Sequence, residues 1–255
     1  MNKIAKHVIL DILRNKIVIA YTLFLFISSM GLFLMEDNPE KSMTSILTIN
    51  LTLIPLVSII FSTIYVYNST EFIEFLAAQP IRRKTLWTNI FYGLSLSLAL
   101  AFLIGCGIPI LIFAAGPTGW AMLVMGVLLS VIFVSIALLA SVYTKDKARG
   151  IGISILLWFY FTLVFDGIVL FLLFQLMDYP LETILVGFSI LNPIDLARIL
   201  ILLKMDISAL MGASSAVFKQ IFGGNLGMLL ATFIMFLWVI LPLSLSLKKF
   251  KRKEL

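Results

Sequence analysis

The chain has 255 residues, of which 61% are hydrophobic and only 13% are charged, with a mean hydropathy of +1.11. Soluble domains are about 45–50% apolar and about 25% charged, so this composition excludes an ordinary water-soluble fold. The net charge of +6 does not indicate nucleic-acid binding, because the basic residues lie in short segments that flank apolar runs. One cysteine and one histidine exclude an internal disulfide and a multi-histidine metal site.

Residues 1–16 have the pattern of an amphipathic helix. They are too charged for the apolar core of a signal peptide, so no cleaved signal is expected. We expect an interfacial helix with its apolar face in the lipid and its basic face toward the headgroups, and a solvated His7. The apolar face contains Ile4, Ala5, Val8, Ile9, Ile12 and Leu13, and the basic face contains Lys3, Lys6, His7 and Arg14.

Six apolar runs follow, each long enough to cross a bilayer. A hydrocarbon core about 30 Å thick needs about 20 helical residues at about 1.5 Å each. The runs are residues 17–35, 46–67, 88–115, 120–143, 151–177 and 226–247. The sequence therefore predicts an all-α integral membrane protein with six transmembrane helices in a single transmembrane domain, residues 1–255.

The distribution of basic residues predicts the orientation. With the N-terminus in the cytoplasm, 15 of the 19 Lys and Arg residues fall on the cytoplasmic side, and only Lys41, Arg198, Lys204 and Lys219 lie outside. The positive-inside rule therefore predicts that both termini are cytoplasmic in a multi-pass protein of the inner (plasma) membrane.

The loop at residues 68–84 predicts a short cytoplasmic helix. Asn68, Ser69 or Thr70 can cap it, two glutamates favour its first turn, and Pro80 ends it. We expect its apolar side chains to share one side and a basic cluster to follow. Such a helix can dock into a groove of a partner, or it can lie on lipid beside positive-inside charges. Its apolar residues are Phe72, Ile73, Phe75 and Leu76.

Two features within the predicted spans stand out. Asp166 lies near the middle of the fifth span, where an ionisable group costs about 2.5–3.5 kcal/mol and needs a partner or water. It is either a cavity or subunit-interface residue, or a structural Asp that is protonated, hydrogen-bonded or capping a helix break. Residues 105–109, with Gly105, Cys106 and Gly107, predict a kink or a close helix contact. Cys106 has no second thiol or imidazole nearby in sequence, and the 11 methionines are scattered, which indicates packing rather than metal binding.

Residues 178–225 are predicted to be an external segment. Residues 181–205 are apolar enough for a seventh span, but polar residues interrupt them, and a seventh crossing would place the basic C-terminal tail outside. We therefore expect short outer-surface helices before the last span, interfacial or re-entrant, and then an external loop. The interrupting residues are Asn192, Pro193, Asp195 and Arg198.

The helix in the 68–84 loop, with its early glutamates, its Leu and Phe residues and its Gln79-Pro-Ile-Arg-Arg83 ending, resembles the coupling helix of ABC-2-type transporter permeases. The order of elements along the whole chain is also similar, although residues 68–70 depart from the Arg-Gly that many members carry there. The resemblance implies a homodimer that contacts a separate ATPase, and the ATPase binds the cofactors ATP and Mg. The implied coupling residues are Glu71, Phe72, Glu74, Phe75, Gln79, Arg82 and Arg83.

A narrower resemblance lies in residues 191–199, Leu-Asn-Pro-Ile-Asp-Leu-Ala-Arg-Ile, together with Asp166-Gly167. These residues resemble the NosY permease subunits of the NosDFY system, which serves copper-site assembly on nitrous oxide reductase. That resemblance implies a NosF-like ATPase and a periplasmic β-helical NosD-like protein as partners. It also implies that the NosD-like partner contacts the chain at four residues, which are Asn192, Pro193, Asp195 and Arg198.

The sequence contains no G-x-x-x-x-G-K-[ST] phosphate loop, and with one histidine it cannot form H-E-x-x-H, so no enzyme activity is expected in this chain. Three hypotheses follow. The first is an ABC permease subunit, serving copper-enzyme maturation or acting as a general exporter of lipid, drug or peptide. The second is an ion-coupled secondary transporter, for which Asp166 is the one clear mid-membrane ionisable residue. The third is a membrane scaffold that transports nothing.

Overall fold

The computed structural model describes residues 3–36, 38–175, 187–205 and 224–252. These ranges are helical and contain no strand. Six helical runs are long and apolar enough to cross a membrane, which confirms the predicted fold class. The orientation of the termini stays a prediction, and most of the predicted external loop lies outside the described residues.

The first half of the chain contains α1 (Lys3–Leu13), α2 (Lys16–Met35), α3 (Pro39–Asn68), α4 (Thr70–Ala77), α5 (Arg83–Phe102), the π-helix η1 (Leu103–Gly107) and α6 (Ile108–Phe113). The second half contains α7 (Pro117–Tyr143), α8 (Lys147–Phe159), the π-helix η2 (Tyr160–Val164), α9 (Phe165–Gln175), α11 (Pro193–Lys204) and α13 (Asn225–Lys251). The local sequence explains where several helices begin. The side chains of Asn15, Asn38 and Asp146 accept hydrogen bonds from backbone N–H groups in the first turns of α2, α3 and α8.

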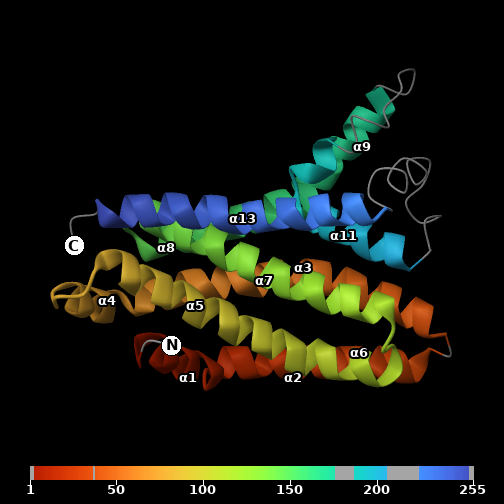
Figure 1. Ribbon diagram of the computed structural model, residues 1–255, viewed down its shortest axis with the longest axis horizontal. Helices are drawn as coiled ribbons and strands as arrows, with labels where there is room; N and C mark the ends of the chain where they lie inside the picture. The colour runs from red at the N-terminus through yellow and green to blue at the C-terminus, as the bar shows by residue number, and fades with distance from the viewer. Residues whose placement is uncertain (1–2, 37, 176–186, 206–223, 253–255) are drawn as a thin grey trace.

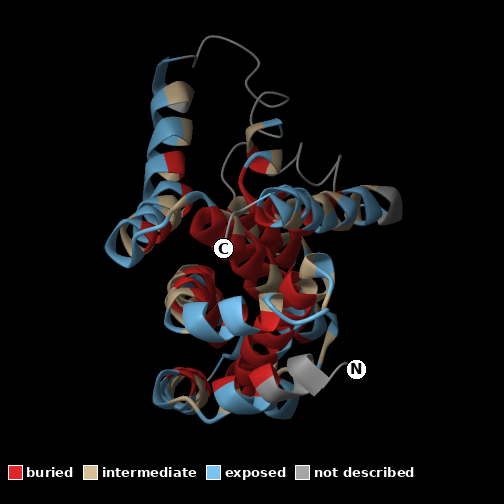
Figure 2. Cartoon of the chain, turned by 90° about the vertical axis from the view of Figure 1, so that its left-hand side faces the viewer, coloured by how far each residue is buried: buried red, intermediate tan, exposed pale blue. Residues whose placement is uncertain are grey.

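Helix α7 is the centre of the bundle. It packs against α3 and α13 and also touches α5 and α11 (Figure 1). Figure 2 shows the buried residues concentrated in the middle of the molecule, with exposed residues on the peripheral helices. Ser135 on α7 donates to the carbonyl of Val239 on α13 at 2.8 Å. Small polar side chains of this kind let membrane helices approach closely and hydrogen-bond across the contact.

Helix α1 confirms the predicted N-terminal helix but not the environment expected for its apolar face. Val8, Ile9 and Ile12 are buried within the chain, because α1 packs against α5. These side chains are therefore covered by protein rather than lipid. In Figure 1, α1, α4 and the C-terminal end of α13 all lie at one end of the bundle, which is the predicted cytoplasmic end.

The glycines of η1 provide the close contact that the sequence predicted. A Cβ atom added to Gly105 would lie 2.8 Å from the carbonyl oxygen of Thr22 and 2.8 Å from the Cβ of Leu25, both on α2. The neighbouring Cys106 is buried, and its Sγ accepts from Ser29 Oγ at 3.4 Å and from Asn50 Nδ2 at 3.1 Å. The π-helix thus brings α2, α3 and the third span together.

Replacing Gly105 by alanine is expected to destabilise the fold by about 1–3 kcal/mol, because the methyl group meets backbone that cannot rotate away. The matched control is Gly31→Ala in α2, where an added Cβ has nothing within 4 Å. The control should be neutral or slightly stabilising, because alanine favours helix over glycine. Thermal unfolding of both variants in detergent measures the difference. Equal midpoints would show that the contact between η1 and α2 is looser than described.

Candidate functional site

The short helix predicted in the 68–84 loop is present as α4, directly after α3. Ser69 is its N-cap residue, but its side chain makes no capping hydrogen bond. Thr70 instead turns its hydroxyl back to the carbonyls of Tyr67 at 2.9 Å and Val66 at 3.2 Å. The helix is therefore positioned by the end of α3 and by its own packing rather than by a side-chain cap.

The apolar residues of α4 lie on one side of the helix, as predicted, but they are covered to different extents. Ile73 and Leu76 are buried, and α4 packs against α3 and α5. Phe72 and Phe75 are 43% and 65% exposed. One pair of side chains thus anchors the helix to the bundle, and the other pair is left at the surface, where a partner can reach it.

The polar residues predicted for ATPase coupling also separate into two groups. Most of them are exposed around α4, but Arg83 is only partly exposed, and its NH1 donates to the carbonyl of Lys251 at 3.5 Å. Arg83 therefore joins the loop to the end of α13. The exposed residues of this group are Glu71, Glu74, Gln79 and Arg82.

A groove of about 480 Å³ opens beside α4, and nothing in the sequence predicted it. One wall comes from α1 and the other from the corner between α3 and α4, which lie far apart along the chain. The amphipathic pattern of α1 predicted which of its residues lie on the same side of the helix, but it did not predict that α1 lies beside α4. The groove is lined by Val8, Leu10, Asp11, Arg14, Tyr65, Asn68, Ser69 and Phe72.

Two sets of contacts tie this corner to the spans. Trp87, near the start of α5, donates its ring N–H to Ser246 Oγ at 2.7 Å and stacks on Phe250 with the centroids 4.2 Å apart. Asn68 accepts from Lys147 Nζ at 2.7 Å, which joins the end of α3 to the start of α8. Helix α4 itself packs against α5 and α3, so these contacts connect it to α13 through α5 and to α8 through α3.

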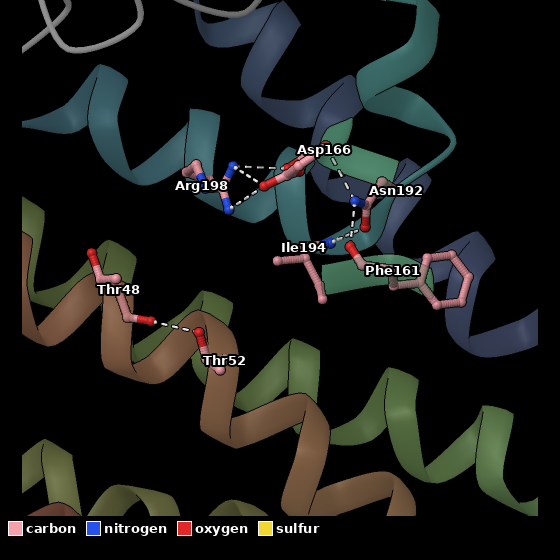
Figure 3. A network of polar contacts seen from close by, with 8 residues as sticks. Thr48, Thr52, Phe161, Asp166, Asn192, Ile194 and Arg198 are labelled. Carbon is pink, nitrogen blue, oxygen red and sulfur yellow. Dashed lines mark hydrogen bonds and ion pairs between the residues drawn. The ribbon is translucent and has the colours of Figure 1, made fainter. Parts of the chain in front are cut away.

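At the other end of the bundle, Asp166 has a partner that the sequence did not reveal. Both terminal nitrogens of Arg198 lie 3.3 Å from Asp166 Oδ2, and Arg198 NH1 also lies 3.1 Å from Asp195 Oδ1 (Figure 3). Asn192 Nδ2 donates to Asp195 Oδ2 at 3.1 Å. Arg198 thus links α11 to the fifth span, and the pairing supports the structural interpretation of Asp166.

Asn192 is a structural residue at the junction of η2 and α11. Its Nδ2 donates to the carbonyl of Phe161 at 2.9 Å, and its Oδ1 accepts from the N–H of Ile194 at 3.0 Å. Phe161 lies inside η2, where the regular α-helical hydrogen bonding is interrupted. Asn192 and Pro193 are buried, whereas Arg198 and Asp166 are partly exposed. Of the four predicted partner contacts, Arg198 is therefore the most accessible.

Helix α11 is packed more deeply than a surface helix. Most of its residues are buried, and it contacts both α7 and α13. The structure therefore favours insertion among the ends of the spans over a position on the outer surface. Burial raises the pKa of Asp195 on this helix to about 7; the Asp166 carboxylate adds to the rise and Arg198 opposes it.

No protein-family model matches the chain. It is 29% identical over 230 residues to a protein of Pseudomonas aeruginosa named probable ABC transporter permease protein NosY, with 81% of this chain and 82% of the relative covered. It is 25% identical over 273 aligned positions to a protein of the same name from Stutzerimonas stutzeri, with 98% and 97% covered. The chain is thus similar to NosY permeases over most of its length. This similarity and the six apolar helices support a multi-pass permease subunit of an ABC transporter.

Proposed function

We propose that this NosY-like chain converts ATP hydrolysis by a separate ATPase subunit into movement of its transmembrane helices. The similarity to NosY permeases over most of the chain carries this proposal. The form of α4 supports it, because Phe72 and Phe75 are exposed on a helix that Ile73 and Leu76 anchor to the bundle. Exposed aromatic side chains on a fixed helix suit docking into an apolar groove of a partner.

In this proposal the ATPase, which binds ATP and Mg, docks on α4 and on the groove between α1 and α4. Closure of two ATPase subunits pushes α4, and the contacts of Trp87 and Asn68 carry the push into α13 and α8. The packed spans then rock as rigid bodies. In this proposal the working permease is a homodimer, since the described residues of one chain supply six candidate spans and two chains would match the two ATPase subunits.

The finer role that we propose is copper-site maturation of nitrous oxide reductase, in the inner membrane. The partners would be a NosF-like ATPase and a periplasmic NosD-like β-helical protein. The similarity to two proteins named as NosY permeases supports this role. Helix α11 supports it too, because the partly exposed Arg198 on this helix is ion-paired to Asp166 in the fifth span. A protein bound at α11 would thus be in contact with the moving spans.

Gentle affinity purification from native membranes, with mass spectrometry of the proteins recovered, tests this role. We expect an ATPase and a periplasmic repeat protein to copurify with the chain. An ATPase without a periplasmic protein would reduce the proposal to a general ABC-2 exporter of lipid, drug or peptide. The absence of both from a complex shown to be intact would overturn the ABC assignment and leave secondary transport or a scaffold role.

A further inference from the structure

A groove of about 270 Å³ lies between α3, η2 and α11, beside the ion pair of Arg198 and Asp166. Thr44, Thr48 and Thr52 line it from α3, and their spacing of four residues places them on one face of that helix. In Figure 3, Thr48 and Thr52 lie on the side of α3 that faces α11. Thr162 and Arg198 complete the polar lining, and the other walls are aliphatic.

The threonines of α3 offer hydrogen-bond acceptors to this groove. Thr44 donates its hydroxyl to the carbonyl of Glu40 at 2.9 Å, and Thr48 and Thr52 donate in the same way to residues four positions earlier, at 3.2 Å and 3.1 Å. Each hydroxyl hydrogen is thus already used, and the oxygen lone pairs remain. Arg198 supplies donors on the opposite wall, so the groove presents both kinds of group.

Lipid is a poor occupant for this groove. The side chains of Arg198 and Asp166 are 38% and 35% exposed, and charged groups are costly in contact with hydrocarbon. The buried hydroxyl of Thr162 has no hydrogen-bond partner within the described part of the chain, which is also unfavourable without water. A volume of about 270 Å³ has room for roughly nine waters at about 30 Å³ each.

We propose that the groove between α3, η2 and α11 is a water-filled pocket, open to the predicted outer side, that binds small uncharged polar solutes with both donor and acceptor groups. We infer that the solute is uncharged because the positive charge of the Arg198 guanidinium is already paired with the carboxylates of Asp166 and Asp195. The pocket stands independently of ATP coupling, since it rests on residues at the other end of the bundle from α4.

Cysteine accessibility tests the pocket in the full chain. Thr48→Cys and Thr52→Cys are small changes, and the native Cys106 is fully buried, so the wild-type chain gives a low background. The probe is a membrane-impermeant trimethylammonium methanethiosulfonate, added to sealed membrane vesicles of each orientation. It needs a thiolate, which forms in water and is suppressed in apolar surroundings.

The matched control is Ile27→Cys, at an exposed position on α2. Ile27 lies eight residues before the end of α2 and Thr48 lies nine residues after the start of α3, so the two positions are about equally far from the turn that joins these helices. Ala115→Cys, exposed in the turn between α6 and α7, is the positive control. We expect Thr48→Cys to react roughly 100-fold or more faster than Ile27→Cys, because each unit rise in thiol pKa removes a factor of ten in thiolate.

Reaction at both threonine positions from the same side as Ala115→Cys, slowed by an excess of glycerol as a neutral polar solute, would support the pocket and its ligand class. Unreactive Thr48→Cys and Thr52→Cys beside a reactive Ala115→Cys would overturn it, because lipid or a second copy of the chain would then fill the groove. Reaction only from the side opposite to that of Ala115→Cys would show that the pocket does not open to the predicted outer side. Reaction unaffected by glycerol would overturn the ligand class.

Discussion

Replacing Phe75 by alanine is expected to weaken the affinity of the permease for its ATPase by about tenfold or more. Phe75 is the most exposed large apolar side chain of α4, at 65%, and the buried Ile73 and Leu76 hold the helix in place without it. Aromatic side chains that fill a partner's pocket typically contribute about 2 kcal/mol or more on truncation, and about 1.4 kcal/mol corresponds to tenfold. The measurement is the binding of purified ATPase to the permease in nanodiscs.

Reversing the charges of Glu71 and Glu74 to lysine should add to this loss and lower ATPase stimulation by the permease, because both side chains are exposed beside Phe75. The matched control is Phe233→Ala on α13, a similarly exposed phenylalanine away from α4. The control should bind the ATPase normally. If the Phe75 variant also binds and couples normally, α4 is not the docking element.

Replacing Arg198 by methionine is expected to destabilise the outer end of the bundle by about 2 kcal/mol. The change leaves Asp166 and Asp195 close together without a positive partner. Hydrogen bonds to charged groups contribute about 1.5–3 kcal/mol. We take the lower part of that range because Arg198 and Asp166 are each more than a third exposed, and solvent screens the pair. Thermal unfolding in nanodiscs measures the effect.

A second substitution separates the ion pair from simple loss of packing. Asp166→Asn in the Arg198→Met background should recover part of the stability, because it removes an uncompensated charge. Lys204→Met, at the exposed end of the same helix, should change little. If the double variant is no more stable than Arg198→Met alone, the cost comes from packing of the long arginine side chain rather than from the two charges.

The sequence by itself determined the class of fold and the number of spans. Both depend on the length and composition of continuous apolar runs, which are visible without knowing which helices meet. The existence of α4 was predictable for the same reason, since its early glutamates and Pro80 act within a few residues. The close contact at Gly105 was also predictable, because a missing side chain in a span leaves room for another backbone.

Only the tertiary structure decided which side chains meet across helices. Arg198 and Asp166 are 32 residues apart, and the sequence placed one outside the membrane and the other within it. The sequence predicted the apolar side of α4 but not that the bundle covers Ile73 and Leu76 and leaves Phe72 and Phe75 exposed, because helical periodicity does not show which residues a neighbouring helix covers. The covering of α1 by α5 and the insertion of α11 beside α7 and α13 depend likewise on contacts between distant segments. Local patterns reflect neighbours along the chain, whereas these contacts depend on how the whole bundle packs.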